Sequence, residues 1–340
     1  MNEEQPSWIG FANVQLALGR TGIAAQLYDA ALPHLRVQCG DLHSSTLACR
    51  MNLGVALGEE GDVVKAETHL TEVLAAYRAT LTDANPDTLS AMASLGIVLE
   101  RARRPEEAKA YLRDALRLRR AALGGTHPDT LSSIATLAAC LGNQGELDEA
   151  EQLLVEAADG HRLIAERTGG DGTTALLSCT LNIAIMRDLR EDWPGAEAAY
   201  GDALSLARQL PGETAQDMAQ NATNRLVRVL LRQRKRDAAE AVLTDNWRQQ
   251  CAAQGSAHAD TLAAAELLSK LLTRRRKFPE AATLWREVLD ACRAAHGDAA
   301  AETTAVAQQL AACLRSQGET AELAELELSF ATALTQLSVE

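Results

Sequence analysis

Apolar and small side chains recur along the chain at intervals of 42 residues. The clearest marker is the segment HPDTL at 127–131, and related segments stand at 43–47, 85–89 and 258–262. Each marker is followed by apolar residues at the i, i+3, i+4 spacing that gives an α-helix one buried face. Self-similarity at a period of this length predicts an array of helical repeats, each too small to bury its apolar face alone.

Aligned on these markers, the copies share columns that predict two antiparallel helices packed closely together. In the first helix a large apolar residue precedes a small one, and the small column reads Ala12, Gly54, Gly96, Ala138, Ala184, Ser269 and Ala311, with Val227 as the exception. Twelve residues later stands an alanine column: Ala24, Ala66, Ala108, Ala150, Ala196, Ala239 and Ala281, with Leu323 in the last copy. Four residues further on the side chains are bulky: Tyr28, Leu70, Leu112, Leu154, Tyr200, Leu243 and Trp285. Small side chains let two helices approach, and the bulky ones fill the space between one pair and the next.

Glycine and proline mark where these helices end and begin. A turn after a helix often needs positive φ, and the glycines that follow predicted first helices are Gly19, Gly61, Gly145 and Gly318. Pro86 and Pro128 stand at the starts of first helices, where a missing N–H costs nothing. We therefore expect a short N-terminal tail at 1–6 and copies at about 7–42, 43–84, 85–126, 127–172, 173–215, 216–257, 258–299 and 300–340.

The junction between the fourth and fifth copies is longer than the others. The alanine column advances 46 residues from Ala150 to Ala196, against 42 between most copies, and the extra residues fall at 167–174 (RTGGDGTT). This glycine-rich segment matches neither phosphate-binding glycine motif, and no predicted strand precedes it. We expect a linker that lets the two parts of the array flex.

The spacing of the small, alanine and bulky columns resembles the tetratricopeptide repeat. The 42-residue length, the HPDTL segment ahead of a first helix and the sequence Glu149-Ala150-Glu151 in a second helix resemble the repeats of kinesin light chains and their relatives. The resemblance implies an all-α, right-handed superhelical solenoid of about eight antiparallel helix pairs, in which the first helices line a concave groove. Kinesin light chains also carry a coiled-coil segment ahead of their repeats, and residues 1–6 hold none, so we do not expect a motor light chain.

The resemblance places a partner-binding groove on the first helices. In copies two to five the inward positions hold mostly small, apolar and amide side chains, with candidates at Asn52, Val55, Ile97, Asn143, Asn182 and Ile185. Such a floor fits a helix or an extended peptide of a partner protein, and the asparagines offer hydrogen bonds to its backbone.

The inward positions of the sixth and seventh copies are polar and basic instead: Asn224, Arg225, Arg228, Arg232, Lys270 and Arg274. Between residues 225 and 277 there are twelve basic and five acidic residues, in a chain of net charge −13. This asymmetry suggests a surface for an acidic segment of a partner. The runs 234–236 and 274–277 fall in turns, where solvation and the helix dipole account for basic side chains without a partner. For the inward residues both interpretations stay open.

Composition narrows the class of protein. Hydrophobic residues make up 47% of the chain and aromatic ones 3%, so the core is built mainly from alanine, leucine, valine and isoleucine. The acidic net charge argues against nucleic-acid binding, and no apolar run approaches the ~20 residues of a membrane-spanning helix. The N-terminus lacks the basic start and apolar stretch of a signal peptide, and the seven cysteines are best explained as small buried side chains in a reducing compartment. We expect a cytoplasmic protein that does not insert into membranes.

No catalytic or metal-binding motif stands out. The sequence has no His-Glu-x-x-His, no Gly-x-Ser-x-Gly and no Cys/His pair with metal-ligand spacing. His43, His127 and His258 share the turn that enters the first helix, where we expect them to bond backbone groups at the helix start. We therefore expect no enzyme, no cofactor and no metal site.

Three hypotheses of function follow. The leading one is a scaffold or adaptor whose groove holds a peptide or helix of a partner protein. The second is a regulatory subunit that senses a ligand, flexes about the 169–172 loop and controls a separate effector. The third is a constitutive subunit of a larger assembly.

Overall fold

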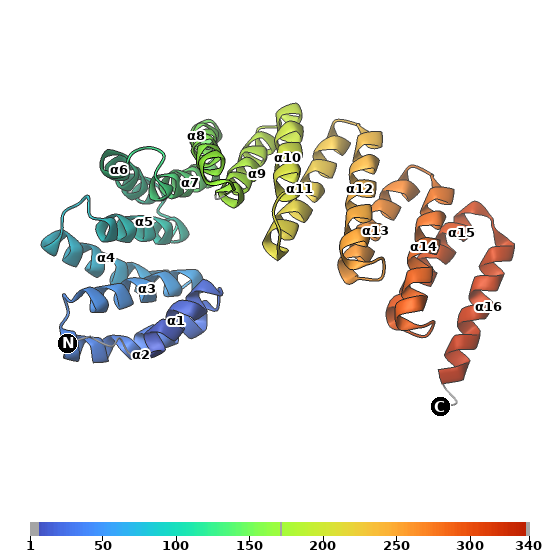
Figure 1. Ribbon diagram of the computed structural model, residues 1–340, viewed down its shortest axis with the longest axis horizontal. Coiled ribbons are helices and arrows are strands. Elements are labelled where there is room, and N and C mark those ends of the chain that lie inside the picture. Colours follow the sequence, from blue (N-terminus) through green and yellow to red (C-terminus); the bar gives the residue numbers. More distant parts are fainter. Residues whose placement is uncertain (1–6, 171, 338–340) are drawn as a thin grey trace. The chain divides into compact units, whose positions relative to one another are not determined.

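The computed structural model describes the backbone of residues 7–170 and 172–337, with side chains within 8–331. The expected tail at 1–6 lies outside these residues. The described backbone forms sixteen α-helices and no strand, which confirms the all-α class. The helices fall into two compact units, residues 1–215 (unit 1) and 216–340 (unit 2), each a row of stacked helix hairpins (Figure 1).

Unit 1 contains five helix pairs. Its first helices are α1 (Ser7–Ala17), α3 (Ser44–Glu60), α5 (Pro86–Arg101), α7 (Pro128–Asn143) and α9 (Thr173–Leu189). Its second helices are α2 (Thr21–Cys39), α4 (Val63–Thr80), α6 (Pro105–Leu123), α8 (Leu147–Thr168) and α10 (Trp193–Ala207). Each first helix packs on its own second helix and, from α3 on, on the second helix of the preceding pair. The first helices α1, α3, α5 and α7 also contact one another in succession.

Unit 2 contains three pairs. Its first helices are α11 (Glu213–Arg232), which begins just before the boundary, α13 (Ala259–Arg274) and α15 (Ala301–Gln317), and its second helices are α12 (Arg236–Gln254), α14 (Phe278–His296) and α16 (Thr320–Leu337). Gln250 Nε2, late in α12, donates to Gln220 Oε1, early in α11, at 2.8 Å, so this pair is antiparallel. The contacts from α12 to α16 run in chain order.

The turns that enter first helices are capped by the marker segments. The Nδ1 atoms of His43, His127 and His258 accept the N–H of the second residue after each histidine at 3.2–3.3 Å, and Asn85 Oδ1 does the same at 2.9 Å. Each bond satisfies a backbone donor that has no partner inside the helix. The expected helix-start role of the three histidines is confirmed.

The small column sets how closely each helix pair packs. A Cβ atom added to Gly96 would lie 2.8 Å from Leu112 Cγ and 3.3 Å from the Ala108 carbonyl oxygen of the second helix. Gly54 is in the same position against Leu70 and Ala66. In the seventh copy Ser269 takes the small position and accepts a hydrogen bond from Trp285 Nε1, in the bulky column, at 2.8 Å. Trp285 is only 1% exposed, as expected for a packing residue.

The turns inside the helix pairs all place one residue in the left-handed region. Four of them use glycine, as predicted: Gly19, Gly61, Gly145 and Gly318 have φ between 71° and 90°. The other four use larger residues, with φ of 60° at Arg103, 61° at Glu191, 63° at Arg234 and 59° at Arg276. A side chain in this region costs about 1–2 kcal/mol relative to glycine, so these four turns are strained.

The division of the chain does not fall where the glycine-rich segment suggested. The two units meet at residues 215 and 216, whereas the 167–174 segment lies inside unit 1. There α8 and α9 pack against each other, and Gly172 lies so close to α8 that an added Cβ would be 3.2 Å from the His161 carbonyl oxygen. The loop joins two helices that pack together, and flexing about it stays a prediction.

Two glycine substitutions test the close approach of the paired helices. Gly96→Ala should lower the free energy of unfolding by about 1–2 kcal/mol, because its methyl group would overlap Leu112. Gly201 lies in the middle of α10, and no atom is within 4 Å of a Cβ added there. Gly201→Ala should therefore raise the free energy of unfolding by about 0.5–1 kcal/mol. Urea denaturation of both variants measures the difference. Equal effects of the same sign would mean that the small column does not limit the packing.

Candidate functional site

The first helices of unit 1 leave one row of side chains only partly covered. Val55, Ile97 and Ile185 follow the large buried column by two residues, and all three are half-buried. The column residue Leu53 beside Val55 is 1% exposed. Consecutive first helices from α1 to α7 lie side by side, which places Val55 and Ile97 on adjacent helices, and the fourth copy has the exposed Ala139 at this position. We call this row the first-helix face.

The asparagines of this face are held by neighbouring copies. Asn52 Nδ2 donates to Asn13 Oδ1 at 3.2 Å and to the Tyr28 hydroxyl at 3.4 Å, and that hydroxyl donates to Asn13 Oδ1 at 2.6 Å. Burial raises the pKa of Tyr28, so the hydroxyl stays protonated as a donor. Asn143 Nδ2 donates to the Glu100 carboxylate. The amide donors of Asn52 and Asn143 therefore already bond within the array, whereas Asn182 is half-buried beside Ile183.

Asn13 was not among the residues predicted from the sequence. It occupies the column of Val55, two residues after Phe11. That position was visible in the alignment, but its bonds to Tyr28 and Asn52 join two copies and depend on how they stack.

In unit 2 the same column turns from apolar to basic. Arg228 and Lys270 take the positions that Val55 and Ile97 hold in unit 1, and both are exposed, as are Arg232 and Arg274 one helical turn further on. Lys270 Nζ pairs with Glu266 at 3.1 Å, so part of its charge is compensated. Arg225 Nε donates to Asn221 Oδ1 at 2.9 Å, and Asn224 accepts from Gln220 at 3.2 Å.

The basic runs in the turns are of two kinds. Arg275 binds the carboxylates of Asp237 and Glu240, and Lys277 Nζ binds Glu240 at 2.7 Å. The hydrogen bond from Arg275 lowers the pKa of Asp237. These two basic residues thus fasten the α13–α14 turn to the start of α12, and for them the solvation interpretation is wrong. Arg274, in contrast, is an exposed helix-end residue.

The second helices of neighbouring copies are joined by ion pairs at repeated positions. Arg113 on α6 binds Glu149 on α8 at 2.8 Å, and Arg286 on α14 binds Glu322 on α16 at 2.6 Å, which is the same pair four copies later. Further along α6, Arg120 binds Glu156 on α8 at 2.6 Å.

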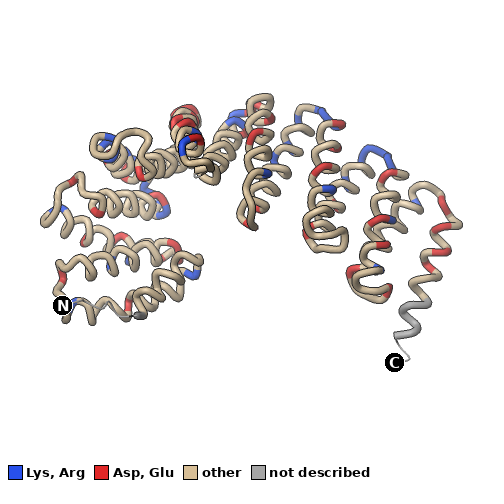
Figure 2. Tube along the Cα trace, in the orientation of Figure 1, with Lys and Arg blue, Asp and Glu red and all other residues tan. Residues whose placement is uncertain are grey.

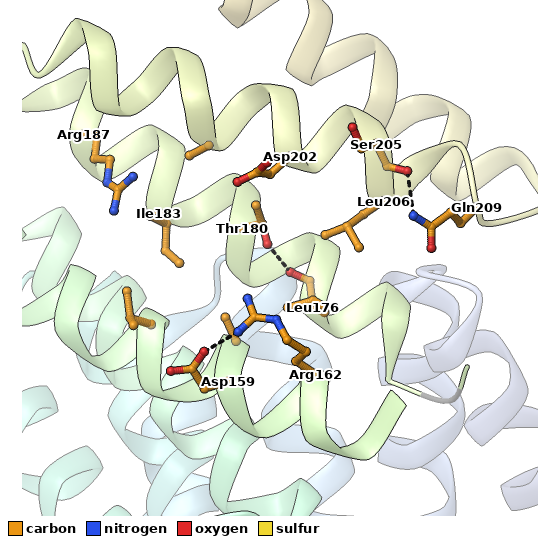
Figure 3. A pocket seen from close by; sticks show the side chains of 13 residues that line it. Asp159, Arg162, Leu176, Thr180, Ile183, Arg187, Asp202, Ser205, Leu206 and Gln209 are labelled. Atoms are coloured by element: carbon orange, nitrogen blue, oxygen red, sulfur yellow. Dashed lines mark hydrogen bonds and ion pairs between the residues drawn. The ribbon is translucent and has the colours of Figure 1, made fainter. Parts of the chain in front are cut away.

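One such pair is not formed, and a cleft lies in its place. Arg162 on α8 and Asp202 on α10 occupy the positions of Arg120 and Glu156, yet Arg162 binds Asp159 of its own helix at 2.5 Å. Figure 3 shows this bond, with Asp202 across the cleft. The cleft is about 360 Å³ and is lined by residues of α8, α9 and α10, all in unit 1.

Two alanines help to open this cleft. Ala158 stands where the other copies up to the seventh have leucine or tryptophan, as at Leu116 and Trp247. Ala199 stands where they have Leu27, His69, Tyr111, Leu153, Val242 and Leu284. Both alanines line the cleft, together with Leu176 and Ile183 on its floor. Sequence analysis did not single out these residues, although the two alanines depart from their columns.

In the part of the chain that the structure describes, no helix is both long enough and apolar enough to cross a membrane. The same residues contain no group of three or more side chains that could hold a metal ion.

Comparison with protein families now identifies the repeats. One family model described as tetratricopeptide repeat matches residues 87–163, and a second with that description matches 46–87 and 261–299. The matched segments begin within the marker segments and cover most of α3–α8 and of α13–α14. The chain contains tetratricopeptide repeats at 46–163 and 261–299. The 42-residue period and the marker segments resemble those of kinesin light chains.

Solved structures share this fold at low sequence identity. BtubC (BKLC) from P. vanneervenii is 20% identical with a TM-score of 0.57, over 70% of this chain and 93% of that one. A Podosopora anserina protein named for kinesin light chain, with nearly identical TPR-like repeats, is 20% identical with a TM-score of 0.50, over 60% and 94%. A signal transduction ATPase from Pyrococcus horikoshii with a tetratricopeptide repeat sensor is 13% identical with a TM-score of 0.60, over 95% and 44%. No curated protein sequence matches the chain.

Removing Glu240 tests whether the α13–α14 turn is fastened as described. Glu240→Ala should lower the melting temperature by about 2 °C or more, because Arg275 and Lys277 both lose a carboxylate. Glu266→Ala removes only the exposed partner of Lys270 and should change the melting temperature by less than about 1 °C. Circular dichroism melting of both variants makes the comparison. A larger loss in Glu266→Ala would contradict the assignment.

Proposed function

We propose that this chain is a protein-interaction scaffold or adaptor, not an enzyme, and that its first-helix face binds a peptide or helix of a partner protein. Tetratricopeptide repeats generally serve in protein–protein interaction. The observation that carries the proposal is the half-buried set Val55, Ile97 and Ile185, which occupies one position of the second, third and fifth copies. A partly covered apolar row on adjacent helices suits the apolar side of an incoming helix.

The polar groups of the face differ in how they would contribute to binding a partner. Asn182 is the asparagine of the face placed for a bond to a partner's backbone, since Asn52 and Asn143 already donate to Asn13 and Glu100. In unit 2 the basic column at Arg228 and Lys270, with Arg225, Arg232 and Arg274 beside it, favours an acidic segment of the partner. Asn224 lies next to Arg225 and belongs to the same surface.

Paired substitutions test the apolar part of the face. The double variant Val55→Asp/Ile97→Asp introduces two carboxylates into the row and should abolish recovery of partner proteins in an affinity purification from the native host, read by mass spectrometry. The control is Val64→Asp on α4, because Val64 is an apolar residue of a second helix that is 73% exposed. Both variants must keep the helical content and melting temperature of the original chain.

The outcomes separate clearly. Loss of the same proteins in the double variant but not in Val64→Asp supports the first-helix face. Retention in the double variant, or equal loss in the control, contradicts it. Purification of the chain only in a fixed stoichiometric complex would favour the constitutive-subunit hypothesis instead.

A second candidate function is the sensing of a small ligand, and the cleft of unit 1 favours it. Its volume of about 360 Å³ lies at the lower end of the range of ligand sites, roughly 300–1,000 Å³. It combines an apolar floor with the carboxylate of Asp202 on one wall and Arg162 on another. The Pyrococcus horikoshii neighbour, whose repeats are named a sensor, adds an analogy of fold.

Filling the cleft tests this second function. The double variant Ala158→Leu/Ala199→Leu places in the cleft side chains of the size found in the other copies. If the cleft binds a metabolite, a thermal-shift screen should find a compound that raises the melting temperature of the original chain by about 2 °C or more. The filled variant should lose that shift. A shift that survives the filling would place the ligand elsewhere.

A further inference from the structure

Two turns of unit 2 bring seven basic residues together. The α11–α12 turn carries 234–236 and the α13–α14 turn carries 274–277, and both appear as blue segments in Figure 2. Arg275 Nη1 donates to the Arg236 carbonyl oxygen at 3.2 Å, so the turns touch. The bonds of Arg275 and Lys277 to Glu240 hold them in this position.

Four arginines of these turns remain without a compensating acid. The side chains of Arg234, Arg236, Arg274 and Arg276 are exposed, and none forms a hydrogen bond or ion pair with a described residue. We call these four residues the arginine edge. Arg275 and Lys277 use up the nearby carboxylates of Asp237 and Glu240, so the four cations face solvent in two touching turns.

The backbone indicates that folding alone does not select these arginines. Arg234 and Arg276 have φ of 63° and 59°, at the turn position where four other copies have glycine. Glycine would remove a strain of about 1–2 kcal/mol at each turn. Arg103 has the same φ in unit 1, so strain by itself does not mark a site. What sets unit 2 apart is that two strained arginines lie in contacting turns, each with a second uncompensated arginine beside it.

The net charge of residues 1–215 favours a short acidic segment over larger anionic partners. Residues 1–215 contain 18 basic and 30 acidic residues, so a long polyanion or a membrane surface that reached them would be repelled. A short acidic segment avoids this repulsion. The guanidinium group also binds carboxylates through two parallel hydrogen bonds. Arg274 is the last residue of α13, one turn beyond Lys270, so a segment bound at the edge is next to the first-helix face.

We propose that the arginine edge binds a short, aspartate- and glutamate-rich segment of a partner protein. This inference rests on the proposed function and adds to it the chemistry of one segment of the partner. It assigns the main contact with the acidic segment to the turns, and not to the neighbouring first-helix residues Arg228 and Lys270.

The test measures binding and stability in the same variants. The probe is a fluorescein-labelled peptide of twelve glutamates, titrated with the full chain and followed by fluorescence anisotropy at two salt concentrations. The double variant Arg234→Gly/Arg276→Gly should bind about tenfold more weakly or worse. It should also melt at a higher temperature, because the strain is relieved. A merely structural role for the two arginines predicts a lower melting temperature.

Arg103→Gly is the matched control. Arg103 occupies the same turn position with φ of 60° and is exposed. Its replacement should raise the melting temperature in the same way and leave peptide binding within about twofold, since it lies in unit 1.

Four results would overturn the proposal. They are no binding of the peptide by the original chain, equal loss of binding in Arg103→Gly, unchanged binding in the double glycine variant, and tighter edge-dependent binding of a twelve-nucleotide single-stranded RNA or of phosphatidylserine vesicles. If Arg228→Gln/Lys270→Gln loses the peptide while the double glycine variant keeps it, the acidic contact lies on the first-helix face. The proposed function would then stand without the arginine edge. Failure of the Val55→Asp/Ile97→Asp experiment would remove the proposed function independently.

Discussion

The close approach of the two helices in each pair is the constraint on which the rest of the structure depends. At Gly54 and Gly96 there is no room for a methyl group, because the leucine and the backbone carbonyl of the second helix lie against the first. The bulky column then fills the space beyond, as Tyr28, Tyr200 and Trp285 do with at most 1% exposure. This packing fixes which faces of a first helix are covered, and it leaves one row partly open.

The two binding surfaces follow from that packing in different ways. The first-helix face exists because Val55, Ile97 and Ile185 point away from the helix pair that buries Leu53 and its equivalents. The arginine edge exists because Asp237 and Glu240, the carboxylates that reach the α13–α14 turn, bind Arg275 and Lys277. Glu240 compensates Arg275 and Lys277, and Arg276 has no ion pair with an acid among the described residues.

Periodicity in the sequence predicted most of the fold, because each column reports a contact that every copy repeats. The helix-entry role of His43, His127 and His258, the turn glycines and the buried position of Trp285 could all be read in this way. Contacts made in only one place could not. The bonds among Asn13, Tyr28 and Asn52, the division at 215 and 216 and the unformed Arg162–Asp202 pair depend on how particular copies stack. The binding role of the predicted face remains a proposal.

Hydrogen–deuterium exchange of the full chain, with and without a partner recovered by affinity purification, tests the central claim most directly. The claim is that partners bind on the first helices and the turns next to them. We predict slower exchange on binding in α3 and α5, and in the 234–236 and 274–277 turns if the partner carries an acidic segment. The second helices α4 and α6, and α12 beyond Arg236, should be unchanged. Protection confined to those second helices would contradict the account.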